Sequence, residues 1–329
     1  MNTNDGQPIQ PGACDICGCT RYRFHASLCF EGYPGPFRLW RCRRCGVVVN
    51  WPQLGSDAIR DQYDGAYYIF REPPARRWSR TTQLYLDHLQ PLEGDMGGKR
   101  LLDVGCASGE LLTLAKSRGW DAHGVELSPQ AARTAREQHG LNVHVGTLED
   151  QNGTLGTFDI IIATDVIEHV TSPRLFVEAI RERLRPGGRV VLETPNWGGR
   201  WRRFGGRRWL GYNRFHVFLF DERSLKTLMH RAGFSSYSTY TTTHTGYAHW
   251  GHRPELLWLA DGLPEGLRWR AQRWLNWMTP VSQATKLQCQ PPCSPEEAVE
   301  WIERCADTRV ATNKSARSTG DNLTVSARV

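Results

Sequence analysis

Four cysteines near the N-terminus stand in two Cys-x-x-Cys-Gly sequences. They are Cys14, Cys17, Cys42 and Cys45. Four thiolates complete the tetrahedral shell of a zinc ion and leave no position open for a substrate. The spacing therefore predicts a structural zinc ribbon over residues 13–50. Redox-active cysteine pairs are the alternative, and Cys19 and Cys29 are rival ligands.

A second chemical signal is the loop 105–109 (Gly-Cys-Ala-Ser-Gly), which follows the apolar run Leu101–Val104. Glycines in such a loop let the backbone approach an adenosine cofactor closely. The loop departs from the dinucleotide fingerprint, because Glu110 stands where the third glycine would be. Glu126 ends the next expected strand, where its carboxylate can accept hydrogen bonds from both ribose hydroxyls. A helix-capping or surface acid is the alternative reading of Glu126.

Strands and helices alternate from residue 100 onward, which is typical of a mostly parallel sheet covered by helices on both faces. The expected strands are Arg100–Val104, Asp121–Glu126, Asn142–Val145, Phe158–Ala163, Arg189–Glu193, Ser236–Thr242 and a closing Asn322–Ala327. Helices are expected at 57–68, 76–92, 109–118, from Ser128-Pro129 onward, at 173–184 and at 222–232. A turn is expected at Pro186-Gly187-Gly188.

Three further sequences lie in the second half of this pattern: 158–170 (FDIIIATDVIEHV), 184–188 (LRPGG) and 192–196 (LETPN). Together they resemble the class I S-adenosylmethionine-dependent methyltransferases. The resemblance covers roughly residues 13–243 and the last strand. It is closest to the branch that contains the ubiquinone-biosynthesis O-methyltransferase and bacterial natural-product and surface-polysaccharide methyltransferases. It implies an α/β fold with a Rossmann-like seven-stranded methyltransferase sheet and a small N-terminal zinc-ribbon module.

The resemblance also implies a cofactor site. Its residues would be Asp103, Gly105, Ala107 and Gly109 at the methionine end, Glu126 at the ribose, Leu127, Leu148 and Glu149 at the adenine, and Thr164 and Asp165 beside the methyl group. Relatives usually carry Gly-x-Gly-x-Gly in the loop, so Ala107 is a small departure.

Methyl transfer from a sulfonium requires mainly in-line positioning of the acceptor. A hydroxyl acceptor also needs its proton removed, and His169 and His216 are the candidate bases. A structural role for either histidine is the alternative. Asp165, Glu168 and His169 form an Asp-x-x-Glu-His group, and in the ubiquinone-pathway relatives the similar position binds a divalent cation. Oxygen-rich ligands would favour Mg²⁺ there, unless Glu168 only supports the helix.

Basic and aromatic residues are concentrated in the segment Trp197–Arg214 (WGGRWRRFGGRRWLGYNR), within a chain of formal net charge +7. Guanidinium groups recognise phosphate bidentately, and tryptophans can stack on a ring. The segment is predicted to be a mobile lid over an anionic or phosphorylated acceptor, with an exposed basic loop as the alternative. Contact with a membrane surface, aided by residues 256–278, is a further expectation.

The chain divides into a disordered tail (1–12), the zinc ribbon (13–50), a helical lid or linker (51–98), a methyltransferase domain (99–243 and 320–329) and a helical Trp/Arg-rich insertion (244–319). The first residues lack the features of a signal peptide, and no run approaches the roughly 18 apolar residues of a membrane span. We therefore expect a cytoplasmic protein.

The predicted function is methyl transfer to a hydroxyl or activated carbon of a sugar, quinone-like ring or natural-product intermediate. RNA methylation is the rival enzyme reading, favoured by the ribbon and the positive charge. It is weakened by the absence of a recognised RNA-binding signature, so a nucleic-acid partner is not expected. A non-catalytic scaffold that binds the cofactor is the other alternative.

Overall fold

The computed structural model describes residues 10–30, 36–61, 63, 70, 72–96, 99–151, 153, 155–209, 211–242, 294–307 and 322–329. Most of the expected tail (1–12) and residues 256–278 of the expected helical insertion lie outside these residues. None of the described helices has the length and apolarity needed to cross a bilayer.

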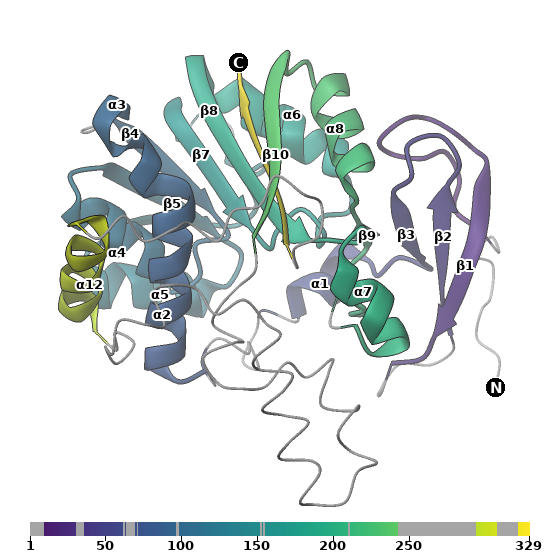
Figure 1. Ribbon diagram of the computed structural model, residues 1–329, viewed down its shortest axis with the longest axis horizontal. Coiled ribbons are helices and arrows are strands. Elements are labelled where there is room, and N and C mark those ends of the chain that lie inside the picture. The colour runs from purple at the N-terminus through teal and green to yellow at the C-terminus, as the bar shows by residue number, and fades with distance from the viewer. Residues whose placement is uncertain are drawn as a thin grey trace, which may run out of the picture.

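The main sheet has seven strands in the order β10-β11-β8-β7-β4-β5-β6 (Figure 1). They are β4 (Arg100–Val104), β5 (Asp121–Glu126), β6 (Asn142–Val145), β7 (Phe158–Thr164), β8 (Leu184–Pro195), β10 (Ser236–Thr242) and β11 (Asn322–Arg328). Strands β6, β5, β4, β7 and β8 are parallel, whereas β11 runs antiparallel to both β8 and β10. The predicted seven-stranded α/β sheet is confirmed.

Strand β8 is longer than predicted from the sequence, because it begins at Leu184 rather than at Arg189. The expected turn at 186–188 is an irregularity within this strand, because the register with β7 shifts between Phe158 and Ile160. Gly188 makes that shift sterically feasible. A Cβ atom there would lie 2.7 Å from the carbonyl oxygen of Arg185.

Helices cover both faces of the sheet. One face carries α2 (Pro74–Leu84), α4 (Glu110–Ser117), α5 (Pro129–His139) and α12 (Pro295–Asp307), and the other carries α6 (Pro173–Arg183) and α8 (Glu222–Arg231). Serine and proline open α5 as predicted, and they also open α6. The Ser128 and Ser172 hydroxyls accept hydrogen bonds from backbone N–H groups.

The helix expected at 76–92 is interrupted. After α2 the chain forms a π-helical turn η2 (Tyr85–Leu89), a 3₁₀ turn η3 (Gln90–Leu92) and the short helix α3 (Glu93–Met96). Pro91 lies in the 3₁₀ turn, where its missing N–H prevents a regular α-helix from continuing. Of the helix expected at 57–68, α1 (Ser56–Asp61) is described.

A buried polar network joins η2 to the antiparallel end of the sheet. The Glu193 carboxylate on β8 accepts hydrogen bonds from Asn322 Nδ2 (3.0 Å) and Thr324 Oγ1 (3.0 Å) on β11. It also contacts His88 Nε2 of η2 at 3.1 Å, and both side chains are fully buried. These contacts satisfy a carboxylate that would otherwise be costly inside the protein.

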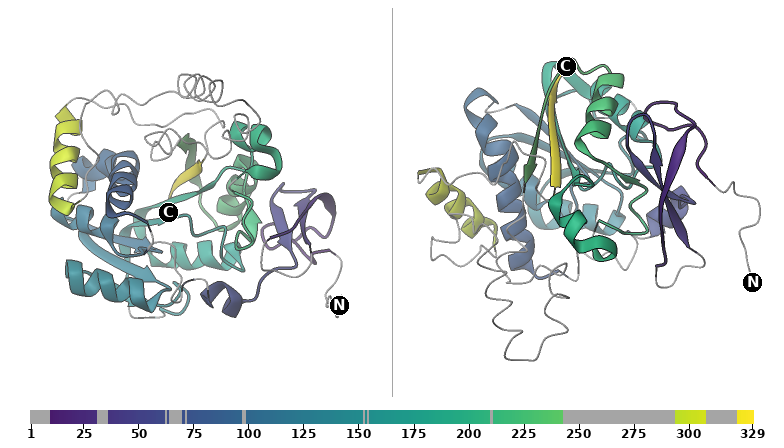
Figure 2. Two further views of the ribbon diagram at one scale, coloured as in Figure 1. Left: turned by 90° about the horizontal axis from the view of Figure 1, so that it is seen from below. Right: turned by 45° about the vertical axis from the view of Figure 1, so that its right-hand side comes forward.

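A second, four-stranded antiparallel sheet contains β1 (Tyr22–Leu28), β2 (Phe37–Cys42), β3 (Val48–Trp51) and β9 (Phe218–Leu219). The cysteine-bearing segment supplies the first three strands, and β9 comes from the methyltransferase part of the chain. Figure 2 shows this sheet beside the main sheet. Ile16 and Val49 share one continuous apolar core with Phe176 and Leu225 of the two covering helices. The cysteine module is therefore packed into the fold rather than tethered to it.

Helix α12 lies within the segment 244–319 that the sequence predicted as an insertion. Ala298 and Ile302 are fully buried against α2 and α4, and their i, i+4 spacing places both on one helical face. This part of the segment belongs to the layer that covers the main sheet. Ser294-Pro295, which precedes Glu296 and Glu297, is a helix-start signal that the sequence analysis missed.

We expect Ile302→Ala to lower the free energy of unfolding by about 2–4 kcal/mol, because it removes a fully buried side chain from a packed interface. Chemical denaturation monitored by circular dichroism measures this change. Glu300→Ala, on the exposed face of the same helix, is the matched control and should change little. Equal stabilities of the two variants would show that α12 is not packed as described.

Candidate active site

A cavity of about 410 Å³ opens at the carboxyl ends of β4, β5 and β7. Residues of the 105–109 loop line it together with the ends of these strands and the start of α6. In an open parallel sheet this edge is where ligands bind. The cavity is therefore the candidate active site.

The loop 105–109 has strained backbone geometry that its small residues allow. Gly105 and Gly109 have φ values of 79° and 87°, and Ala107 has a φ of 51°. A Cβ atom on Gly105 would lie 2.6 Å from Val166, and one on Gly109 would lie 2.4 Å from Leu141. Both glycines are required by shape as well as by φ. Ala107 occupies the left-handed region without being glycine, which costs about 1 kcal/mol.

Glu126 is held by the backbone on both sides. Its Oε2 accepts a hydrogen bond from the Ala107 N–H (2.8 Å), and its Oε1 accepts one from the Ser128 N–H (2.7 Å). The carboxylate is 2% exposed, and burial raises its pKa while these two bonds lower it. Each oxygen retains a lone pair for a further donor. Glu126, the residue predicted to bind the ribose, is therefore held in a fixed position beside the loop and lines the cavity.

Asp103 and Glu110 add two further buried acids to the same region. Glu110 accepts hydrogen bonds from Ser108 Oγ and pairs with Arg77 Nε at 2.9 Å. Burial, together with the nearby charges of Glu126 and Glu110, raises the pKa of Asp103 to about 8. This end of the cavity favours a cation.

All of the predicted cofactor-binding residues line the cavity except Gly109. Gly109 instead precedes the first residue of α4 in a left-handed conformation. Asp165 also has a positive φ, 55°, and its N–H donates to the carbonyl oxygen of Glu193 at 3.0 Å. Strain of this kind at a non-glycine residue is concentrated at functional sites.

Several lining residues were not predicted from the sequence. They are Ile59, Arg60 and Tyr63 from α1 and its C-terminal side, Arg80, Thr81 and Leu84 from α2, and Val170, Thr171, Ser172, Leu175 and Phe176 around the start of α6. In the sequence, the three tyrosines Tyr63, Tyr67 and Tyr68 stand close together, which is a weak signal for the first group. Val170 ends the 158–170 sequence, but no pattern in the sequence marks the others, because they approach the cavity through tertiary packing.

The two histidines proposed as bases lie side by side, with ring centroids 4.7 Å apart. His169 lines the cavity and His216 does not. Burial lowers the pKa of His169 to about 3 and that of His216 to about 4. Both imidazoles are therefore neutral and weakly basic near neutral pH. Their catalytic role stays a prediction, and these pKa values weigh against simple proton abstraction.

The Asp-x-x-Glu-His group does not fit a magnesium site in this structure. Ligand atoms of Glu168 and His169 are grouped with one from His216, and the Asp165 carboxylate is not among them. Two ring nitrogens and one carboxylate form a donor set that Mg²⁺ does not prefer. Burial raises the pKa of Glu168 well above its usual value, and the neighbouring charge of Asp165 adds to this effect.

The prediction that Trp197–Arg214 is a mobile lid over the acceptor is wrong, because none of the described residues of this segment lines the cavity. It forms α7 (Arg200–Gly205) and the 3₁₀ turn η4 (Gly206–Arg208) beside the small sheet. Trp197 and Trp209 are buried with Leu28, Leu39 and Val48. The Arg202 guanidinium lies over the Trp197 ring, and Arg207 Nη2 donates to the carbonyl oxygen of Ser27 at 3.0 Å. These contacts hold the segment against the cysteine-bearing sheet.

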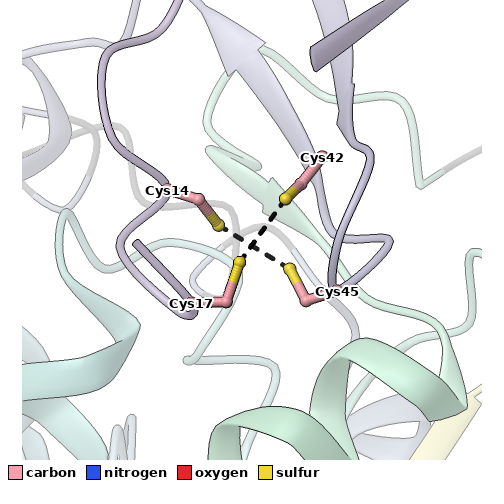
Figure 3. A group of neighbouring side chains, drawn as sticks. All are labelled: Cys14, Cys17, Cys42 and Cys45. Atoms are coloured by element: carbon pink, nitrogen blue, oxygen red, sulfur yellow. Dashed lines mark hydrogen bonds between the residues drawn. The ribbon is translucent and has the colours of Figure 1, made fainter. Parts of the chain in front are cut away.

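The side chains of Cys14, Cys17, Cys42 and Cys45 point toward one another (Figure 3). Their sulfurs lie 3.6 Å apart in the pairs Cys14–Cys45 and Cys17–Cys42. This separation is far longer than the roughly 2.05 Å of a disulfide bond. Zn–S bonds of about 2.3 Å in a tetrahedron would place the sulfurs about 3.8 Å apart. The geometry therefore fits a tetrahedral zinc site and excludes disulfides in these two pairs.

Comparisons with known proteins identify a family and several relatives. A protein family described as "Methyltransferase domain" matches residues 75–239. The ubiquinone biosynthesis O-methyltransferase of Idiomarina loihiensis is 34% identical over 108 residues, which cover 30% of this chain and 43% of the relative. That of Aromatoleum aromaticum is 34% identical over 137 residues, which cover 37% and 58%. The chain thus spans about half the length of the curated relatives it matches.

Solved structures similar to this one include a SAM-dependent methyltransferase from Thermotoga maritima. It has a TM-score of 0.49 and 17% identity, with 82% of this chain and 99% of that chain covered. A SAM-dependent methyltransferase from Archaeoglobus fulgidus has a TM-score of 0.48 and 16% identity, with coverages of 80% and 100%.

We expect Asp103→Asn to stabilise the cofactor-free protein, and to do so more at about pH 9 than at about pH 6. The folded state favours the neutral carboxyl of Asp103. In the parent protein, the contribution of Asp103 to the free energy of unfolding is therefore complete at low pH, and it is lost as the pH rises from 3.8, its ordinary pKa, through about 8. Asparagine cannot ionise and avoids this loss. Thermal melts across the pH range measure the difference, with the exposed Glu137→Gln as control. A variant-minus-parent difference that does not change with pH would contradict the assignment.

Proposed function

The chain belongs to the methyltransferase domain family, in its class I S-adenosylmethionine-dependent branch, and we propose that it transfers the cofactor's methyl group to a hydroxyl or activated carbon of a small molecule. The observation that carries this proposal is the shared cavity of the 105–109 loop and Glu126. The relatives named as ubiquinone biosynthesis O-methyltransferases support an oxygen acceptor on a ring.

The cofactor supplies an electrophilic methyl group on a positively charged sulfur. Asp103 and the loop would hold its methionine end, and Glu126 would accept hydrogen bonds from the ribose hydroxyls. Leu127, Leu148 and Glu149 line the part of the cavity proposed for the adenine. Thr164 and Asp165, at the end of β7, would then border the methyl group. Most of the rate acceleration would come from alignment, which can be worth about 7–11 kcal/mol of the barrier.

The lining of the cavity supports a neutral acceptor better than a phosphorylated one. Its two arginines face acids, with Arg60 3.6 Å from Asp150 and Arg80 3.1 Å from Glu72. The wall around the start of α6 is mainly apolar, with Val170, Leu175 and Phe176, and Ile59 and Tyr63 lie on the α1 side. These side chains suit a ring or an apolar substituent.

A structural zinc ion at Cys14, Cys17, Cys42 and Cys45 is the second part of the proposal, supported by the sulfur separations. Zinc there would have four protein ligands and no open position, so it would contribute to folding rather than to chemistry.

The proposed activity is tested by incubating the protein with S-adenosylmethionine and catechols, quinols, sugars or bulk RNA as acceptors, and by measuring the S-adenosylhomocysteine that forms with each. We expect turnover with a small ring or sugar hydroxyl, and Glu126→Ala should weaken cofactor binding by about 1.5–3 kcal/mol, because it removes charge-assisted hydrogen bonds. Calorimetry measures this loss, with Glu137→Ala as control. Unchanged affinity in a folded Glu126→Ala protein would refute the ribose assignment. Turnover on RNA alone would replace the small-molecule proposal.

We expect Cys14→Ser to lose the ribbon zinc and to lower the melting temperature, because structural zinc contributes folding energy. Metal analysis and thermal melts measure the two effects. Cys29→Ser changes an exposed cysteine outside the cluster and should alter neither. Full zinc content and an unchanged melting temperature in Cys14→Ser would exclude these four residues as the zinc site.

A further inference from the structure

We propose that Asp15, in the first cysteine knuckle (residues 14–18), positions the wall of the cavity that faces the acceptor. Asp15 Oδ1 accepts a hydrogen bond from Ser172 Oγ at 2.7 Å, and Oδ2 accepts one from the Arg174 N–H at 2.9 Å. Both partners belong to the start of α6, far from the knuckle along the chain. The assignment of this wall to the acceptor rests on the proposed function, whereas the contact itself does not.

Helix α6 has no acidic residue in its own first turn, which instead contains Arg174. A negative charge is favourable at this end of a helix, and a positive one is not. Ser172 is the N-cap, and its hydroxyl accepts a hydrogen bond from the Leu175 N–H at 3.3 Å. The same hydroxyl donates to Asp15. Asp15 therefore supplies the carboxylate that the helix lacks, and it satisfies a backbone N–H that has no partner within the helix.

The turn that Asp15 caps is part of the cavity wall. Ser172, Leu175 and Phe176 line the cavity, as does Val170 just before the helix. The side chains of Val170, Leu175 and Phe176 make this wall apolar, which suits an acceptor ring. A helix that frays at its first turn would no longer hold these side chains in one arrangement. The Asp15 carboxylate therefore acts on the acceptor through the wall, without touching the acceptor itself.

The first knuckle holds Asp15 in a fixed turn. The Gly18 N–H donates to the carbonyl oxygen of Cys14 at 2.7 Å, and the Cys14 N–H donates to that of Cys19 at 3.0 Å. Asp15 lies between Cys14 and Cys17, two of the four residues proposed to hold zinc. Whatever fixes these two sulfurs also fixes the backbone from which the Asp15 carboxylate reaches α6. The ribbon would thus influence the acceptor wall through the shape of this knuckle.

The second cysteine knuckle (residues 42–46) contacts α8 instead, and this contact offers a matched control. Arg41, just before the knuckle, pairs with Asp221, the N-cap of α8, at 2.9 Å. Arg223 Nη2 of α8 donates to the carbonyl oxygen of Arg44 at 2.6 Å. No residue of α8 lines the cavity. Removing the Arg223 side chain therefore weakens the contact between ribbon and helix without touching the acceptor wall.

The first measurement is backbone hydrogen exchange on the full chain as purified, without cofactor or acceptor. In Asp15→Ala the amides of residues 174–176 should exchange about five- to tenfold faster, the usual effect of a lost helix cap. Asp15→Asn keeps an oxygen that can accept from the Arg174 N–H and should restore most of the protection. Arg223→Ala should leave these amides unchanged. The zinc content of all three variants should equal that of the parent.

The second measurement is methyl-transfer kinetics with the ring or sugar acceptor that the parent turns over. Asp15→Ala should raise the KM for this acceptor by about two- to tenfold, because a wall that is less often in place lowers the apparent affinity. We expect kcat and the affinity for S-adenosylmethionine to stay close to the parent values. Asp15→Asn and Arg223→Ala should both resemble the parent in all three quantities.

Exchange at residues 174–176 that stays as slow in Asp15→Ala as in the parent would overturn the inference. Equally fast exchange in Arg223→Ala would also overturn it, because the effect would then come from general loosening of the ribbon. A parallel loss of acceptor and cofactor affinity in Asp15→Ala, or a loss of zinc, would assign Asp15 to stability instead of positioning. If the parent methylates no acceptor, the proposed function fails, and the exchange measurement still decides whether Asp15 holds the wall.

Discussion

The backbone of the segment 215–220 is hydrogen-bonded on two sides, and the candidate site depends on this arrangement. On one side the Asn50 N–H donates to the carbonyl oxygen of Val217. On the other, the N–H groups of Val217 and Phe218 lie 2.8 and 3.2 Å from the carbonyl oxygen of Glu168. The segment therefore joins the small sheet to the wall of the cavity. A displacement of the ribbon would move Glu168 and its neighbours with it.

The opposite end of the cavity is governed by charge. Asp103, Glu110 and Glu126 are all buried there, and Arg77 pairs with Glu110. Desolvation of several carboxylates in one place is unfavourable unless a cation approaches. A positively charged sulfonium would relieve this cost more than the neutral thioether left after methyl transfer. The same electrostatic term that binds the cofactor would thus assist release of the spent form.

Much of the fold and of the cofactor end could be predicted from the sequence, because the signals there are local. The loop 105–109 directly follows β4, Glu126 ends β5, and the apolar run Ile160–Ile162 marks a strand buried on both faces. The spacing of Cys14, Cys17, Cys42 and Cys45 likewise predicts the cluster that these four side chains form. In each case neighbouring residues in the chain carry the whole pattern.

The remaining features could not be predicted because they depend on contacts distant in sequence. Nothing local to His216 indicates that its ring meets that of His169. The lid hypothesis failed because Trp197 and Trp209 were interpreted as ligand contacts, whereas packing with the ribbon buries them. Helix α12 packs on the main fold although residues 243–293 separate it from β10, and neither its start signal at Ser294-Pro295 nor its apolar residues Ala298 and Ile302 indicate where it packs.

The position of β11 has a consequence for the order in which the protein can fold. This strand lies between β8 and β10, although it follows both along the chain, with residues 243–321 intervening. During synthesis, β8 and β10 must wait for residues 322–328 before the sheet can close, and non-local pairings of this kind are slow to form. Until then Glu193 lacks Asn322 and Thr324, and the edge of β8 is unpaired. A nascent chain at this stage exposes an open sheet edge, the state in which chains most readily associate with one another.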